Sequence, residues 1–279
     1  MKIGAYLRLM RFHKPSGLLL LWLPTAWALW VANQGMPKLR IVILFFVGTV
    51  LMRAAGCVVN DIADRHVDQH VKRTSLRPLT SGELGLTAAF FTLFILLLGA
   101  LWVVMQLPLQ CFYYAMAALG LTILYPFCKR FFEAPQLILG LAFSMGIPMA
   151  YAASDISVDR VMCLLISLNF AWIVAYDTMY AMADREEDLL IGVKSTAILF
   201  GHQDRLIIFL LQLYFHLVWL VLAITLHWGE KFYIYWVLAA GVLAYQQYLM
   251  SKQSIECYLN AFSTNVIYGF LMWGSLFNL

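Results

Sequence analysis

Long runs of apolar residues alternate with short polar connections along almost the whole chain. Each run holds about 20 residues, which is the length that an α-helix needs to cross the hydrocarbon core of a membrane. A short amphipathic segment over residues 3–12 precedes the first run, and we expect it to lie on the lipid headgroups. The pattern predicts nine transmembrane helices, over residues 16–33, 40–59, 84–105, 109–127, 136–153, 160–180, 205–226, 232–250 and 261–278.

The composition supports an all-α, polytopic membrane protein. Hydrophobic residues make up 63% of the chain, charged residues only 12%, and the mean hydropathy is +0.79. A soluble domain carries about 25% charged residues, so the soluble class is excluded. No hydrophilic stretch is long enough to fold by itself, and residues 1–279 are expected to form a single membrane-embedded domain. The five cysteines are scattered without a CxxC spacing, which indicates apolar fillers rather than disulfides or metal ligands.

The basic residues predict the orientation of these helices. With the N-terminus in the cytoplasm, 15 of the 19 Lys and Arg residues fall on the cytoplasmic side and 4 on the opposite side. This asymmetry is the one that the positive-inside rule describes. The net charge of +4 therefore reports orientation and contact with anionic headgroups, and it does not indicate a nucleic-acid partner.

Two clusters of acidic residues close apolar runs on the predicted cytoplasmic side. A charged side chain at the centre of a membrane helix costs roughly 2.5–3.5 kcal/mol, and an ionisable residue in such a segment is by default a candidate functional residue. The first cluster follows the run 40–59 and contains Asn60, Asp61, Asp64 and Asp68. The second closes the run 160–180 and contains Asp177, Asp184, Glu186, Glu187 and Asp188.

The clusters indicate an internal repeat. Asp64-xxx-Asp68 reappears as Asp184-xxx-Asp188, with each residue displaced by 120 positions. The pattern predicts two pseudo-repeats, over residues 16–127 and 136–250, followed by the last helix. Repeats of this kind place a shared site at their interface in many membrane folds.

The acidic positions share helix faces and suggest a magnesium site. Residues four apart on a helix lie on one face, so one stripe would carry Asn60, Asp64 and Asp68 and another Asp184 and Asp188. Neighbouring carboxylates repel one another unless a cation lies between them. Oxygen ligands without cysteine or paired histidine favour Mg²⁺, which typically bridges carboxylates to substrate phosphates.

A magnesium–diphosphate site in a lipid-facing fold favours polyprenyl diphosphate as the substrate, with its tail in an apolar groove open to the bilayer. Aromatic residues could stabilise an allylic cation there, although they are more often core or interfacial residues. The remaining phosphate charge would be neutralised by basic residues, for which the candidates are Lys72, Arg73, Lys129 and Arg130.

Four other interpretations compete with this one. The acids could form salt bridges in cytoplasmic loops, and His66 with His70 could bind zinc. A divalent-cation transporter would place its acids near the middle of the bilayer rather than at helix ends. A CDP-alcohol phosphotransferase requires Asp-x-x-Asp-Gly-x-x-Ala-Arg, whereas Asp61-Ile-Ala-Asp64 is followed by Arg65.

Residues 53–68 resemble the NDxxDxxxD motif of the UbiA superfamily of intramembrane aromatic prenyltransferases, with Asn60 at its first position. Residues 175–201 resemble the DxxxD motif of that family. A KSTA-x-LFG sequence ends this segment and is similar to the subfamily that prenylates 4-hydroxybenzoate in ubiquinone synthesis. Matches to the same subfamily continue in residues 71–79, 125–130 and 135–140.

The resemblance implies a bacterial inner-membrane enzyme with nine helices around a central cavity. It implies Mg²⁺-dependent transfer of a polyprenyl group from polyprenyl diphosphate to the 4-hydroxybenzoate carbon ortho to the hydroxyl, or to another aromatic acceptor such as homogentisate or a naphthoate. No obligate protein partner is implied. Either Asp184 or ionisation of the phenol itself would account for loss of the ring proton.

The resemblance also assigns roles to individual residues. The expected metal ligands are Asn60, Asp64, Asp68, Asp184 and Asp188, and the expected catalytic residues are Asp64, Asp184 and Arg130, the last gripping a substrate anion. The expected substrate-binding residues are Asn60, Asp61, Lys72, Arg73, Arg77, Tyr125, Lys129, Asp177, Tyr180 and Lys194. Of these, Asp61 fits either a supporting ligand or a residue that contacts the ligands from behind.

Overall fold

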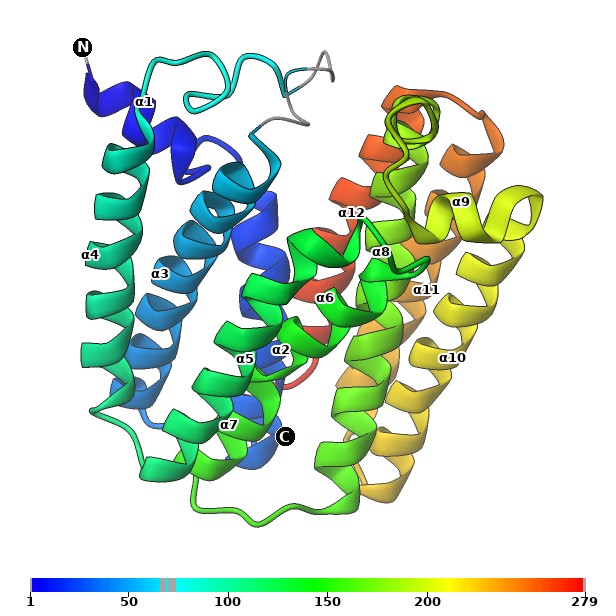
Figure 1. Cartoon of the computed structure of the whole chain (residues 1–279). Coiled ribbons are helices and arrows are strands. Elements are labelled where there is room, and N and C mark those ends of the chain that lie inside the picture. Colours follow the sequence, from blue (N-terminus) through cyan, green and yellow to red (C-terminus); the bar gives the residue numbers. More distant parts are fainter. Residues whose placement is uncertain (1, 66–68, 70–73, 278–279) are drawn as a thin grey trace.

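The computed structural model describes residues 2–65, 69 and 74–277, and the regular structure of this part of the chain is entirely helical. The all-α prediction is therefore confirmed (Figure 1). Asp68, Lys72 and Arg73, and with them the zinc candidates His66 and His70, lie outside the described residues. The helices are α1 (Lys2–Leu9), α2 (Ser16–Ala32), α3 (Leu39–Asp64), α4 (Leu86–Val104), α5 (Leu109–Cys128), α6 (Pro135–Ser144), α7 (Gly146–Ala153), α8 (Arg160–Ile191), α9 (Thr196–Phe200), α10 (Asp204–Thr225), α11 (Glu230–Ser251) and α12 (Ile255–Gly274), with a 3₁₀ turn η2 (Gly201–Gln203).

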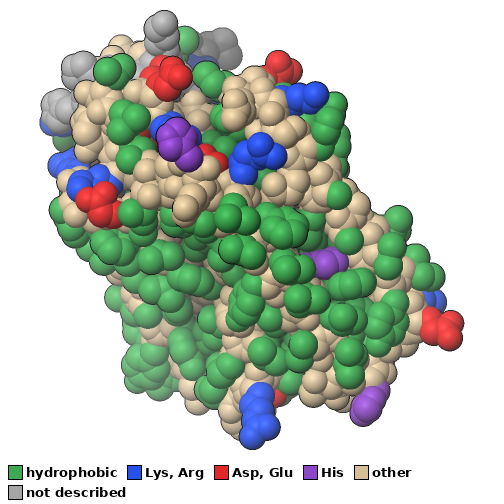
Figure 2. Space-filling view, turned by 90° about the vertical axis from the view of Figure 1, so that its right-hand side faces the viewer, with side chains coloured by type: hydrophobic (Ala, Val, Ile, Leu, Met, Phe, Trp, Pro, Cys, Tyr) green, Lys and Arg blue, Asp and Glu red, His purple; other side chains and the backbone are tan. Residues whose placement is uncertain are grey.

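Several of these segments suit a membrane. Within the described residues, six are long and apolar enough to cross it: α3, α4, α5, the pair α6–α7, α8 and the segment from α9 through α10. Helix α2 is apolar but shorter. The chain is thus a multi-pass membrane protein, and the count of nine spans stays a prediction. Figure 2 shows charged side chains at both ends of the visible face, most of them at the upper end, with a broad hydrophobic band between.

Three helices run further than the predicted apolar spans. Helix α8 continues to Ile191, because residues 181–191 are mostly good helix formers and contain neither Gly nor Pro. Helix α3 continues to Asp64. Helix α12 begins at Ile255, where the Ser254 hydroxyl accepts the backbone N–H of Cys257 at 3.3 Å as an N-cap. Much of each acidic cluster therefore lies on helix rather than in a loop.

The helices form a closed ring. Successive neighbours in contact are α2, α3, α4, α5, α6–α7, α8, α10, α11 and α12, and α12 returns to α2. Contact between α4 and α5 is slight. The span α6–α7 is broken beside Gly146, where a Cβ atom would lie 2.1 Å from Thr25 Oγ1, so only glycine allows α2 to approach this closely. The two pseudo-repeats stay a prediction.

The packed core lies on one side of the ring. Trp27 of α2 contacts Trp172 of α8 and Trp219 of α10, with ring centroids 4.8 and 5.3 Å apart. This core includes many of the apolar residues buried along α2, α8, α10, α11 and α12. The opposite side, formed by α3, α4 and α5, is less filled, and the cavity described below extends there.

Helix α1 lies across the end of α3 (Figure 1). Ala5 and Leu9 are buried against Ala54 and Val58 of α3. The opposite face of α1 exposes apolar side chains such as Ile3. One face thus packs on protein, and the other is suited to the headgroup layer where we expected this segment.

Candidate active site

A cavity of about 760 Å³ opens inside the ring of helices. Its wall comes from α2 to α8, with Phe262 as the contribution of α12. Polar side chains line the end where α3, α5 and α8 finish, and apolar side chains of α3, α4 and α5 line the remainder. The cavity is therefore suited to a molecule with a charged head and an apolar tail.

The sequence-predicted site residues come together at the polar end. All of those that lie within the described residues line this cavity: Asn60, Asp61, Asp64, Arg77, Tyr125, Lys129, Arg130, Asp177, Tyr180, Asp184, Asp188 and Lys194. Of the predicted set, only Asp68, Lys72 and Arg73 lie outside the described residues. The placement brings the residues together but does not test their roles, which stay predictions.

The two acidic sets face one cavity from different helices. Asn60 and Asp64 lie at the end of α3, and Asp184 and Asp188 lie on the last turns of α8. Among the described residues, no three His, Cys, Asp or Glu side chains are grouped closely enough to hold a metal ion. However, the amide oxygen of Asn60 is buried and has no hydrogen-bond partner in the described part of the chain. A ligand set that consists of this amide oxygen and carboxylate oxygens suits a hard cation such as Mg²⁺, which can also bind a substrate phosphate.

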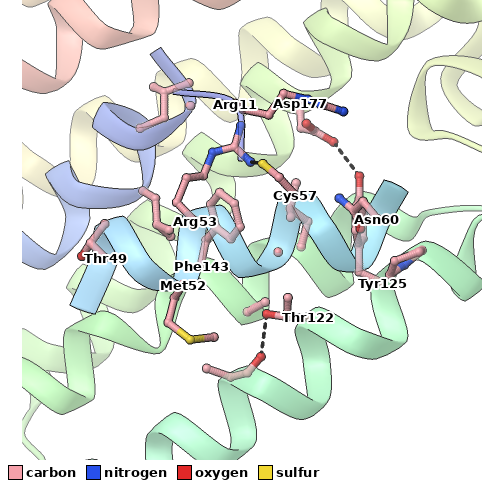
Figure 3. A pocket seen from close by; sticks show the side chains of 18 of the residues that line it. Arg11, Thr49, Met52, Arg53, Cys57, Asn60, Thr122, Tyr125, Phe143 and Asp177 are labelled. Carbon is pink, nitrogen blue, oxygen red and sulfur yellow. Dashed lines mark hydrogen bonds between the residues drawn. The ribbon is translucent and has the colours of Figure 1, made fainter. Parts of the chain in front are cut away.

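Helix α5 brings a cation to the first acidic set. Lys129 Nζ lies 3.9 Å from Asp64 Oδ2 and 4.9 Å from the centre of the Tyr125 ring. The Tyr125 hydroxyl donates a long hydrogen bond of 3.5 Å to Asp177 Oδ2 of α8, dashed in Figure 3. Lys129 and Tyr125 therefore connect the α3 acids with those of α8.

Arg130 and Lys194 are held by their surroundings while they line the cavity. Arg130 Nη2 donates to the carbonyl of Ala63 at 2.9 Å, so this guanidinium fixes the end of α3 next to Asp64. The backbone N–H of Lys194 donates to the carbonyl of Lys129 at 2.8 Å, and its ammonium pairs with Glu133. These contacts tie the segments after α5 and α8 together at the polar end.

Arg53 is a cavity residue that we did not assign from the sequence. It lies on α3, and its Nη1 donates to Cys57 Sγ at 2.8 Å (Figure 3). A Cβ atom on Gly17 would lie 2.3 Å from Arg53 Nη2, so the glycine at the start of α2 makes room for the guanidinium. No carboxylate of the described residues forms a salt bridge with it. A signal existed: Arg53 interrupts an apolar run and precedes Asn60 by seven residues, which is two helical turns on one face.

Helix α1 and the segment after it also contribute to the wall. Arg8, Arg11, His13 and Lys14 line the polar end, although their sequence indicated only orientation and headgroup contact. Burial and the nearby Lys14, Arg11 and Arg8 cations lower the pKa of His13 below its ordinary value. The N-terminal segment thus adds basic side chains to the same polar end that the predicted site residues line.

The described part of the chain defines a helical, multi-pass membrane protein with an internal cavity that is polar at one end and apolar at the other. The model of the UbiA prenyltransferase family matches residues 21–265, and the chain belongs to this family. It is 56% identical over 270 residues to a 4-hydroxybenzoate octaprenyltransferase of Legionella pneumophila (strain Lens), covering 97% of this chain and 96% of the relative. Identity is 46% over 272 residues to the enzyme of the same name from Coxiella burnetii (strain CbuK_Q154), covering 98% and 95%.

Solved structures share the fold. A UbiA homolog from Aeropyrum pernix K1 superimposes with a TM-score of 0.80 at 21% identity, over 92% of this chain and 96% of that one. A UbiA homolog from Archaeoglobus fulgidus bound to GPP and Mg²⁺ gives a TM-score of 0.71 at 18% identity, over 96% and 99%. The family expected from the two acidic motifs is thus confirmed, together with the fold class.

Proposed function

We propose that this chain transfers a polyprenyl group from polyprenyl diphosphate to the ring carbon ortho to the hydroxyl of 4-hydroxybenzoate, as a step of ubiquinone biosynthesis. The observation that carries the proposal is the cavity: two acidic sets and several cations share its polar end, and its other end is apolar. The names of the relatives at 46–56% identity over nearly the full chain support the same substrates.

The polar end suits the chemistry of the leaving group. As the allylic C–O bond breaks, negative charge develops on the departing diphosphate oxygen. Lys129, Lys194 and Arg77 line the cavity and would stabilise this charge. Electrostatic stabilisation of this kind is strongest in a site that is already organised and shielded from water. Mg²⁺, which Asn60, Asp64, Asp184 and Asp188 would hold with Asp68, supplies further neutralisation when it is bound.

Arg53 provides a site for the carboxylate of the acceptor. A half-buried guanidinium that forms no salt bridge with a described carboxylate is costly in a membrane helix unless a ligand pairs with it. A benzoate carboxylate on Arg53 would direct the phenol end of the ring toward the acidic sets two turns further along α3. The ring carbon then attacks the allylic carbon while the C–O bond to the diphosphate breaks. The ring proton passes to Asp184, or to water where prior ionisation of the phenol has already activated the ring.

The prenyl tail has a route between α4 and α5. Leu101 of α4 and Met116 of α5 both line the cavity, and they are 45% and 50% exposed. The two helices contact each other only slightly. A long tail would therefore leave the cavity for the lipid between these two helices.

A larger side chain in this groove is expected to change the selectivity for tail length. Ala115 lines the cavity on α5, and Ala115→Phe would fill its apolar part. The turnover ratio of octaprenyl to geranyl diphosphate should fall by about tenfold, since overpacking an apolar site typically costs 1–3 kcal/mol. Ala117→Phe is the matched control, because Ala117 is exposed on the same helix and does not line the cavity. Equal ratios for the two variants would place the tail elsewhere.

The function itself is tested by product analysis. Membranes containing the chain are incubated with labelled polyprenyl diphosphate, Mg²⁺ and one of three acceptors: 4-hydroxybenzoate, homogentisate or a dihydroxynaphthoate. We expect a labelled product with 4-hydroxybenzoate alone, prenylated ortho to the hydroxyl. If a product formed only with another acceptor, the prenyl transfer would stand but the assigned aromatic substrate would change. If no acceptor gave a product, the proposal would be refuted.

The orientation and location belong to the same proposal. We infer that the protein lies in the bacterial inner membrane with its N-terminus and the polar end of the cavity toward the cytoplasm. The distribution of Lys and Arg supports this orientation. Water-soluble 4-hydroxybenzoate and magnesium would then reach the polar end from the cytoplasm.

A further inference from the structure

Three charged side chains from separate segments meet at the polar end of the cavity. Asp61 lies on α3, Arg11 follows α1, and Arg77 precedes α4. Asp61 Oδ1 is 2.6 Å from Arg11 Nη2 and 3.2 Å from Arg77 Nη1. The Asp61 side chain is fully buried, whereas the side chains of Arg11 and Arg77 are 15% and 22% exposed. Both arginines line the cavity.

The backbone of Arg11 adopts a conformation that disfavours side chains. Its φ of +60° lies in the left-handed region, which is unfavourable for an arginine. Arg11 follows the end of α1, where the backbone N–H of Phe12 donates to the Leu7 carbonyl at 3.0 Å, so its backbone conformation is that of a helix C-cap. Two hydrogen bonds hold the side chain, one from Nη1 to the Arg8 carbonyl at 3.0 Å and one from Nη2 to Asp61. These two bonds place the Arg11 guanidinium beside the carboxylate on the cavity wall.

Other contacts already hold the two outer segments. Arg8 pairs with Glu83, which joins the α1 segment to the segment before α4. Leu9 and Leu84 are buried in one apolar cluster with residues of α3. A buried ion pair is weak evidence for stability, because desolvation offsets much of the attraction. The distinctive effect of the Asp61 carboxylate is thus on where the two guanidiniums lie.

We propose that Asp61 is a positioning residue that holds Arg11 and Arg77 as a pair for binding the diphosphate of the substrate. The identity of this anion rests on the proposed function. Both guanidiniums line the cavity, and guanidinium N–H groups match phosphate oxygens in a bidentate manner. In this proposal Asp61 acts through the arginines, and the sequence expectation that it supports the metal site stays a prediction.

Steady-state kinetics on the full-length chain in membranes test the role. Arg11→Gln, Arg77→Gln and Asp61→Asn should each raise KM for the polyprenyl diphosphate by about tenfold, the scale of a lost charge-assisted hydrogen bond. The KM for the aromatic acceptor should stay within about twofold, since the pair binds the other substrate. Arg40→Gln is the charge-matched control, because Arg40 is exposed at the start of α3 and does not line the cavity.

A mutant cycle separates positioning from a structural role. In the Arg11→Gln/Arg77→Gln background, adding Asp61→Asn should cause no further rise in the diphosphate KM, because the groups that Asp61 positions are gone. If Asp61→Asn raised the diphosphate KM of this double variant by the same factor as it raises that of the wild type, the proposal would be overturned. Arginine variants that raise only the acceptor KM would also overturn it. If Asp61→Asn does not accumulate in membranes, Asp61→Glu, which keeps the charge but displaces it, takes its place in the cycle.

Direct binding gives a readout that does not depend on turnover. Calorimetry with inorganic diphosphate and the full chain in lipid nanodiscs, without Mg²⁺ and without acceptor, should show weaker binding for both arginine variants and for Asp61→Asn. Wild-type affinity in these variants would overturn the proposal. A third result would separate the two proposals: the wild-type protein binds diphosphate, the variants do not, and the wild-type protein forms no prenylated product. This result would refute the proposed function and leave the diphosphate-binding role of the arginine pair in place.

Discussion

Replacing Asp64 by alanine is expected to lower the rate of prenyl transfer by about 10³-fold or more. Rate losses of this size are typical when electrostatic or metal stabilisation of a transition state is removed. Asp64 faces Lys129 at the polar end of the cavity and belongs to the α3 set of predicted metal ligands. Asp184→Ala should have an effect of similar size, because it removes a ligand from the opposing α8 set. The measurement is product formation from labelled geranyl diphosphate across a Mg²⁺ titration.

A neighbouring acid provides the control for these variants. Glu186 lies on the same part of α8, but it is exposed and does not line the cavity, so Glu186→Ala should keep a near-normal rate. Equal amounts of each protein in the membrane fraction establish that insertion is unaffected. Near-normal turnover of either aspartate variant would contradict the metal assignment.

Arg53→Gln is the second change with a large expected effect. Truncating one partner of a buried charge pair costs roughly 2–5 kcal/mol, which corresponds to a loss of about 10²-fold in kcat/KM for 4-hydroxybenzoate. The loss should come from the acceptor side, so KM for the prenyl diphosphate should change little. Arg53→Lys should recover part of the activity, because it keeps the charge but not the planar fork.

The acceptor itself supplies an independent check on Arg53. 4-Hydroxybenzamide lacks the carboxylate charge, so the Arg53→Gln and wild-type enzymes should use it at similar rates. Arg160→Gln is the control for charge, since Arg160 is exposed at the start of α8 and outside the cavity lining. If Arg53→Gln impairs both acceptors equally, the guanidinium does not bind the carboxylate.

Much of the fold was predictable from the apolar runs, because a bilayer restricts spanning segments to helices of limited length. The helix ends were less predictable. Residues 181–191 are polar enough to resemble a loop, yet they continue α8 because their helix propensity is high and they face a polar cavity. The close approach of Thr25 from α2 to Gly146 was also not predictable, since it is a contact between residues far apart in the sequence.

The two acidic sets were predictable because their spacing of four residues is a local helical property. That they share a cavity is a tertiary fact, which the repeat suggested and the structure shows. Arg53 carried a readable signal in its periodicity with Asn60. Arg11 carried none, because its contact with Asp61 joins residues 50 positions apart.

The two unlike ends of the cavity bear on how a turnover finishes. Inorganic pyrophosphate is soluble only in water, and a prenylated benzoate dissolves in the acyl chains. The fragments would therefore depart in opposite directions from a single chamber, one past the arginines and the other past Leu101 and Met116. Their immediate separation into different phases would disfavour recombination and make the reaction effectively one-way.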